Sequence, residues 1–157
     1  MSGRRSPDRL REEIREAISA VDDPEYPGLS IVDLGLLETI RVRSGGVTVG
    51  LVPTFSGCPA LAVIAEAVRG AVGRIDGIDD VDVVWLRTPS WSTDRVTRRA
   101  RRILADSFSV AVQFGQQLPT CPRCGEATAP RSAFGPSRCR AIHTCSRCRE
   151  PVEVLRG

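Results

Sequence analysis

Apolar residues at helical spacing open the chain and predict an amphipathic helix from about residue 7. They fall on one face of that helix: Leu10, Ile14, Ala17, Ile18 and Val21. Ser6 suits the N-cap and Pro7 suits the first helical position, because proline lacks the N–H that would find no helical partner there. Pro24 ends the helix, since the residue before a proline disfavours helical backbone.

Alternating β-branched and polar residues then predict strands. Residues 37–43 and 47–53 flank a Ser-Gly-Gly turn, which indicates a β-hairpin. The later elements follow in order: a helix over 59–75, a strand over 81–86 and an arginine-rich helix over 93–106. A strand, a helix and a second strand in succession favour a parallel crossover. The predicted fold class is therefore α+β, with a small mixed three-stranded sheet and packed helices.

Composition limits the class of protein. Of the 157 residues, 41% are hydrophobic and 4% aromatic, so we expect an aliphatic core. No apolar run reaches the roughly 20 residues that a membrane span needs. The first ten residues are not followed by the apolar stretch of a secretion signal. We therefore expect a cytoplasmic protein with no membrane contact.

Charge and cysteine are unevenly distributed along the chain. Residues 1–119 carry 15 Arg and 16 acidic side chains, whereas residues 120–157 carry seven Arg and three acidic ones. Five of the six cysteines lie in the last 37 residues. This change in composition near Pro119 predicts two domains, residues 1–118 and residues 119–157.

The smaller predicted domain has the spacing of a metal site. Cys121-x-x-Cys124 and Cys145-x-x-Cys148 are separated by 20 residues. Two such units place four thiolates around a tetrahedral zinc and are typical of a zinc ribbon. The segment is too short to bury a core, so we expect structural Zn²⁺ to hold it folded. Four protein ligands leave no position for a substrate water, which argues against hydrolysis at the zinc.

Two further side chains in this segment could bind metal. Cys139 lies six residues before Cys145, and His143 is the only histidine in the chain. Either could replace one of the four cysteines, and Cys139 could instead be a fifth thiolate for cluster exchange. The simpler interpretation is that Cys139 is a small buried residue and that His143 is an exposed polar one.

Cys58 stands apart from the other cysteines, just before the helix predicted from Pro59. The dipole at a helix N-terminus lowers the pKa of a thiol and favours the thiolate. That thiolate could bind a soft metal or attack an electrophile, although a lone cysteine is often only a small buried side chain. The one histidine, His143, lies in the predicted ribbon, so no Cys–His pair forms within the first domain. This weakens the interpretation of the chain as a thiol enzyme.

Three carboxylates lie in neighbouring loops that are rich in helix and strand breakers: Asp23, Glu25 and Asp33. They are the acid–base partners that the first domain could offer to Cys58. Asp23 and Asp33 could equally cap helices.

Taken together, these residues resemble a known family. DDPEYPGLSIVDLGLL, followed after the hairpin by PTFSGCPA, is similar to the signature of SufT-like iron–sulfur assembly domains. The tail CPRCG…FGPSRCRAIHTCSRCREP narrows the resemblance to the PaaD family, the accessory proteins of phenylacetyl-CoA ring-epoxidase systems. The resemblance covers residues 8–154, with Arg140 where the family pattern has lysine.

The resemblance implies an accessory protein, not an enzyme, that assists iron–sulfur or other metal-centre assembly for phenylacetate degradation. It implies protein clients, among them the flavin and iron–sulfur reductase or other epoxidase subunits, and a homodimer is a candidate assembly. The family's signature positions in this chain are Asp23, Pro24, Glu25, Asp33, Gly35, Thr54, Gly57, Cys58 and Pro59. It further implies that these loops form one patch around Cys58 for iron or a transient Fe–S cluster, with Cys139 as a candidate extra ligand.

The alternative function is a zinc-ribbon module that binds nucleic acid or docks a protein. Residues 95–102, RVTRRARR, are basic, as nucleic-acid binding requires. Against nucleic acid, the predicted first domain has a slight negative charge, and no aromatic residue interleaves the arginine run. A solvated helix face, with some arginines meeting an acidic protein partner, is the simpler interpretation of this run.

Overall fold

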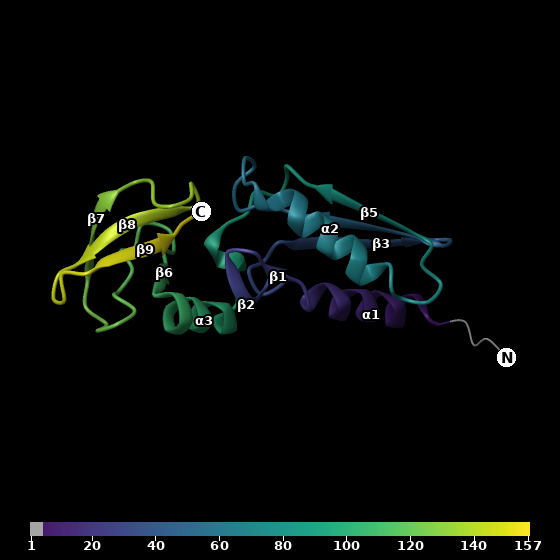
Figure 1. The fold of residues 1–157 in the computed structure, drawn as a ribbon, viewed down its shortest axis with the longest axis horizontal. Coiled ribbons are helices and arrows are strands. Elements are labelled where there is room, and N and C mark those ends of the chain that lie inside the picture. The colour runs from purple at the N-terminus through teal and green to yellow at the C-terminus, as the bar shows by residue number, and fades with distance from the viewer. Residues whose placement is uncertain (1–4) are drawn as a thin grey trace. The chain divides into compact units, whose positions relative to one another are not determined.

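The computed structural model describes residues 5–157, and these form two compact units (Figure 1). The first unit contains the chain up to Pro53 together with Cys58–Ser90, and the second contains Thr54–Gly57 and Trp91–Gly157. Within the described residues, every helix is too short or too polar to cross a membrane.

The first unit begins with a capped amphipathic helix. Its elements, in order, are α1 (Pro7–Ser19), β1 (Asp22–Asp23), β2 (Tyr26–Ser30), β3 (Leu37–Arg43), β4 (Gly46–Leu51), α2 (Ala60–Val72) and β5 (Asp80–Trp85). The Ser6 side chain accepts a hydrogen bond from the backbone N–H of Arg9 at 3.3 Å, which confirms the predicted N-cap. Ile14 and Ile18 are fully buried, as the helical spacing predicts.

The central sheet has the predicted mixed topology. Its strand order is β3-β4-β5, with β3 antiparallel and β5 parallel to β4. Alternate residues of β4, Val47, Val49 and Leu51, are buried, whereas Thr48 is half-buried on the opposite face. α1 packs against β3, α2 packs against β5, and the two helices pack against each other. The core of this unit therefore lies between one face of the sheet and two helices (Figure 1).

A small hairpin between α1 and β3 was not predicted. β1 and β2 pair antiparallel with an irregular register, and β1 has only two residues. Such a short strand carries no alternation of apolar and polar residues, so the sequence pattern does not reveal it.

The second unit contains a four-stranded sheet. Its elements are η1 (Thr93–Arg95), α3 (Arg98–Phe108), β6 (Val110–Val112), β7 (Thr128–Ser132), β8 (Arg140–Cys145) and β9 (Pro151–Leu155). The strand order is β6-β9-β8-β7, with β6 parallel to β9 and the other neighbours antiparallel. Two of the ribbon cysteines belong to its small buried core: Ala111, Cys121, Ala141, Cys145, Val152 and Val154.

The helix predicted over 93–106 is broken near its start. A short 3₁₀ turn, η1, ends at Arg95, and Val96 is extended. Thr97 then begins α3, because its side chain accepts a hydrogen bond from the N–H of Ala100 at 3.1 Å. The local cap therefore divides what the apolar spacing alone predicts as one helix.

The two units also differ in charge. The first carries 10 Arg against 14 acidic side chains, and the second carries 12 Arg against five. Their formal net charges are therefore −4 and +7. The domain boundary predicted after residue 118 lies within the second unit. There β6 pairs with β9 of the ribbon and also packs against α3, so α3 and the ribbon belong to the same unit.

Candidate functional site

The carboxyl end of β4 gathers the loops that carry the candidate residues of the first unit. Val52, just after β4, donates its N–H to the carbonyl oxygen of Leu36 at 2.8 Å. This bond places the turn before β3 beside the chain that leads to Cys58. α1 and α2 run in opposite directions and α2 contacts β1, so the loop after α1 lies at the end where α2 begins (Figure 1). Ligand sites commonly form beyond the carboxyl ends of parallel strands.

Asp22 and Asp23 shape the first of these loops. Oδ1 of Asp23 accepts a hydrogen bond from the N–H of Glu25 at 2.8 Å, and Oδ2 of Asp22 accepts one from the N–H of Gly28 at 2.8 Å. Asp23 is half-buried, and Glu25 is exposed. Asp23 therefore caps a turn between two short strands, and its interpretation as a helix cap is wrong.

Asp33 lies in the turn that joins β2 to β3. The hydroxyl of Ser30 accepts a hydrogen bond from the N–H of Val32 at 3.1 Å, and Leu34 donates its N–H to the carbonyl oxygen of Ser30 at 3.0 Å. Gly35 closes the turn with a φ of 78°, a left-handed conformation that glycine adopts without strain. The turn thus holds the half-buried Asp33 next to the strand ends.

Cys58 lies at the start of α2, as predicted. α2 begins at Ala60, Pro59 is its N-cap, and no side chain caps it. The carbonyl oxygen of Cys58 accepts the N–H of Leu61 at 3.3 Å, so the half-buried cysteine is joined to the first helical turn. A thiolate at Cys58 stays a prediction from this position before the helix.

The loop before Cys58 requires a glycine at position 57, because the Phe55 ring occupies the space that a side chain would fill. A Cβ atom at Gly57 would lie 2.7 Å from Cε1 of Phe55, a separation that requires the ring to move. Phe55 in turn lies under the guanidinium of Arg138, which is 5.5 Å from the ring centroid.

Thr54 and Phe55 belong to the second unit, whereas Cys58 belongs to the first. Asp23, Asp33 and Cys58 thus lie in neighbouring loops, but among residues 5–157 they do not form a group that could hold a metal. The role of these residues, of Glu25 and of Thr54 stays a prediction.

The four ribbon cysteines converge, and their geometry fits a tetrahedral metal site. The Sγ atoms of Cys121, Cys124, Cys145 and Cys148 all lie within 4.8 Å of one another. The distance from Cys121 Sγ to Cys148 Sγ is 3.8 Å, and that from Cys124 Sγ to Cys145 Sγ is 3.4 Å. Tetrahedral zinc, with Zn–S bonds of about 2.3 Å, separates its sulfur ligands by about 3.8 Å. The donor set therefore suits Zn²⁺.

Each pair of cysteines lies in a tight knuckle with the same backbone pattern. Cys121 donates its N–H to the carbonyl oxygen of Glu126 at 2.8 Å, and Cys145 donates its N–H to that of Glu150 at 3.0 Å. In the first knuckle the N–H of Gly125 also donates a hydrogen bond to the carbonyl oxygen of Cys121 at 2.9 Å. The two halves of the site are therefore built alike from separate hairpins.

The thiols of the cluster cannot all ionise without a cation. Burial raises the pKa of Cys145, but the N–H groups of Cys148 and Arg147 and the Cys124 thiol outweigh burial and lower that pKa to about 6. The N–H of Glu150 lowers the pKa of Cys148, but the Cys145 thiol, burial and the other two thiols raise it to about 11. A divalent metal bound to all four sulfur atoms offsets the repulsion between neighbouring thiolates, so that all four thiols can ionise.

His143 is buried, with 3% of its surface exposed, so its interpretation as an exposed polar residue is wrong. It lies in β8, two residues before Cys145, and alternation along the strand places both on the buried face. The Thr128 hydroxyl donates to the carbonyl oxygen of Pro119 at 2.6 Å, and His143 Nδ1 is 3.0 Å from the same hydroxyl. Because the Thr128 hydroxyl already donates its proton to Pro119, its oxygen can only accept a hydrogen bond from His143. Nδ1 of His143 therefore carries the ring proton and donates it to Thr128. Burial lowers the pKa of His143, which favours this neutral form.

Cys139 is buried, as the simpler interpretation expects, with 9% of its surface exposed. Its Sγ lies 3.1 Å from the Ser137 hydroxyl, and its carbonyl oxygen accepts the N–H of Arg156 at 3.2 Å. Within residues 5–157, the group that can hold a metal contains neither Cys139 nor His143. The role of Cys139 as an extra ligand stays a prediction.

Comparison with known families agrees with this division of the chain. The family model described as iron-sulfur cluster assembly protein matches residues 11–85. The model described as PaaD zinc beta ribbon domain matches residues 105–156. The two matches cover the Cys58 loop and all four ribbon cysteines, respectively.

Individual relatives point the same way. The chain is 36% identical over 152 residues to a protein of Escherichia coli K12 that is named as a component of 1,2-phenylacetyl-CoA epoxidase, covering 92% of this chain and 91% of the relative. It is 36% identical to the Fe-S protein maturation auxiliary factor SufT of Staphylococcus aureus over 88 residues, 55% of this chain and 99% of that one. A crystal structure of a DUF59 domain from Bacillus anthracis superposes with a TM-score of 0.59 at 25% identity, covering 63% of this chain and 94% of that one.

Proposed function

Because the chain belongs to the PaaD family of phenylacetyl-CoA epoxidase components, we propose that it helps to assemble the iron–sulfur or other metal centres of such an epoxidase. In this role it is an accessory protein of phenylacetate degradation and catalyses no step of the epoxidation. Two kinds of relative support the proposal, since one is named as an epoxidase component and another as an Fe-S maturation auxiliary factor.

The observation that carries the proposal is the meeting of three loops at the carboxyl end of β4. There Cys58 supplies a soft sulfur donor at a helix N-terminus, and Asp23 and Asp33 lie in the neighbouring turns. Thiolate sulfur is the ligand that iron–sulfur clusters require. We propose that Cys58 binds an iron or cluster intermediate transiently, as cargo, and that Asp23, Glu25, Asp33 and Thr54 complete the site.

The ribbon has a structural role in this proposal. Cys121, Cys124, Cys145 and Cys148 hold Zn²⁺, which serves here only to bind the four sulfur ligands together. The zinc links the knuckle before β7 to the knuckle before β9 and so replaces the large core that this unit lacks. Cys139 is kept as a candidate extra ligand for the cargo.

The proposal includes the setting in which the protein acts. Its clients are the flavin and iron–sulfur reductase or other epoxidase subunits, and its compartment is the cytoplasm. It acts as a monomer or a homodimer, without membrane or nucleic acid. We also propose that the two predicted parts have separate functions. Residues 1–118 assist assembly, and residues 119–157 dock the client.

A complementation experiment tests the proposed function. In a strain from which this chain is deleted, we expect epoxidase activity and growth on phenylacetate to be lost, although the epoxidase subunits are still made. Restoring the intact chain should restore both. Full epoxidase activity in the deleted strain would refute the proposal.

A further inference from the structure

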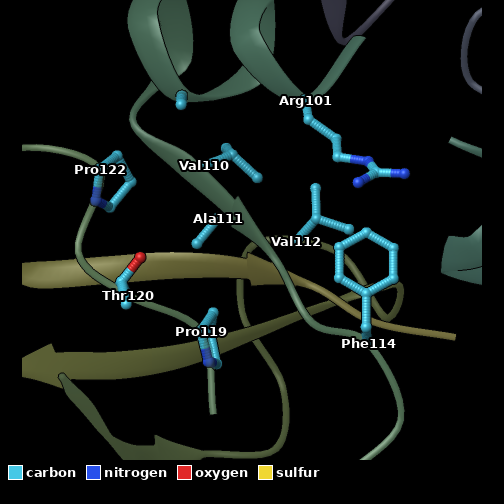
Figure 2. A pocket seen from close by; sticks show the side chains of 9 residues that line it. Arg101, Val110, Ala111, Val112, Phe114, Pro119, Thr120 and Pro122 are labelled. Atoms are coloured by element: carbon cyan, nitrogen blue, oxygen red, sulfur yellow. The ribbon is translucent and has the colours of Figure 1, made fainter. Parts of the chain in front are cut away.

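A groove of about 310 Å³ lies within the second unit, between α3, β6 and the segment that leads to the first knuckle. Figure 2 shows Arg101 and Phe114 on one side of it and Thr120 and Pro122 on the other. Most of the lining is apolar, with Val110, Val112, Phe114, Pro119 and Pro122 among its residues. Its volume is at the lower end of that of ligand pockets, which suits a single anchoring side chain.

Arg101 is held in place beside this apolar lining. Its guanidinium carbon lies 4.5 Å from the centroid of the Phe114 ring, and its Nε donates to the carbonyl oxygen of Val96 at 3.3 Å. Among residues 5–157, no acidic side chain forms an ion pair with Arg101. A guanidinium stacked on a ring keeps its terminal N–H groups available for a carboxylate.

The charge around the groove favours an acidic partner. The second unit has a formal net charge of +7, and α3 also exposes Arg98, Arg99 and Arg102. Complementary charge raises the rate of encounter and selects the partner.

We propose that this groove binds a short acidic segment of a partner protein. One apolar side chain of the segment lies among Val110, Val112 and Pro122, and a neighbouring carboxylate accepts hydrogen bonds from Arg101. The surface is additional to the Cys58 site and does not use it. A nucleic-acid strand fits the groove less well, because Pro119 and Pro122 have no N–H to offer a phosphate and Arg101 already covers one face of the Phe114 ring.

The groove depends on the zinc site for part of its wall. Pro122 lies between Cys121 and Cys124, and the carbonyl oxygen of Pro119 is held by Thr128. Removal of zinc should therefore displace this wall and weaken peptide binding.

Fluorescence anisotropy with the full, zinc-loaded chain tests the proposal. The probe is a fluorescein-labelled peptide, Glu-Asp-Asp-Leu-Leu-Asp-Asp-Glu. Arg101→Gln should weaken its binding about tenfold, because one charged hydrogen-bonded contact is lost. Ala105→Glu, which adds bulk and a carboxylate to the lining, should abolish binding. Arg102→Gln, a matched loss of charge on the same helix outside the lining, should change affinity less than about threefold.

Two further measurements make the outcome decisive. Replacing both leucines of the probe by serine should weaken binding about tenfold, since the apolar anchor is lost. Cys58→Ser should leave peptide binding unchanged, so failure of the maturation proposal and failure of this one are distinguishable. Equal binding by the intact chain, Arg101→Gln and Ala105→Glu, with one zinc retained in each, would overturn the proposal. So would displacement of the probe by a 12-nucleotide oligothymidine that itself depends on Arg101.

Discussion

Gly125 and Arg149 occupy the same place in the two cysteine knuckles, each directly after the second cysteine, and both have left-handed backbone. Their φ angles are 75° and 63°. Glycine adopts this conformation freely, whereas an L side chain is strained there. The first knuckle therefore has the residue that its backbone favours, and the second does not.

Arg149→Gly should stabilise the zinc-loaded protein by about 1 kcal/mol, because the relief of backbone strain exceeds the entropy that glycine gains in the unfolded chain. Gly125→Ala should destabilise it by about 1 kcal/mol. No atom lies within 4 Å of a Cβ placed at Gly125, so the cost there comes from the backbone alone. Urea unfolding of the two variants measures both values, and equal stability of all three proteins would contradict this account of the knuckles.

Zinc affinity should rise with pH. The metal requires four thiolates, and the pKa of Cys148 in the metal-free cluster is raised to about 11, so this thiol must lose a proton on binding. The metal-bound form has the lower proton content and is therefore favoured as pH rises and lost as pH falls. Between pH 7 and 8 we expect the logarithm of the affinity to rise by about one or more. Competition with a chromogenic chelator measures this slope, and a flat profile would show that the four thiols are not the ligands.

The Thr128 hydroxyl should stabilise the second unit through its two buried hydrogen bonds, to Pro119 and His143. Thr128→Val keeps the shape of the side chain but leaves a carbonyl oxygen and an N–H without partners. We expect a loss of about 1–3 kcal/mol in the free energy of unfolding. Thr144→Val, in β8 at a half-buried position, is the matched control and should cost less. The prediction fails if the two variants are equally stable.

The central sheet and the helices packed on it are readable from the sequence because their apolar spacing is long and regular. Leu10, Ile14 and Ile18 mark a helix face, and Val47 and Val49 mark a strand face. By contrast, β1 and β6 have two and three residues, too few to show any period. Only their partners in the folded chain reveal them.

The clustering of the four ribbon cysteines was predictable because CxxC spacing is itself the chemical signal, and zinc as their ligand stays a prediction. His143 was misinterpreted although a signal existed, since it shares the buried face of one strand with Ala141 and Cys145. The groove beside Arg101 had no such signal. Phe114 follows Arg101 by 13 positions, a separation that neither helical nor strand periodicity connects.

The most direct test of the central claim is the iron and acid-labile sulfide content of the epoxidase reductase purified from cells that contain Cys58→Ser in place of the natural chain. We predict that both fall to the level found in cells that lack the chain, because the transient thiolate is missing. The variant itself should keep one zinc per chain and its fold, since Cys58 is not among the four clustered cysteines. A reductase with its full iron and sulfide in the Cys58→Ser cells would contradict the account.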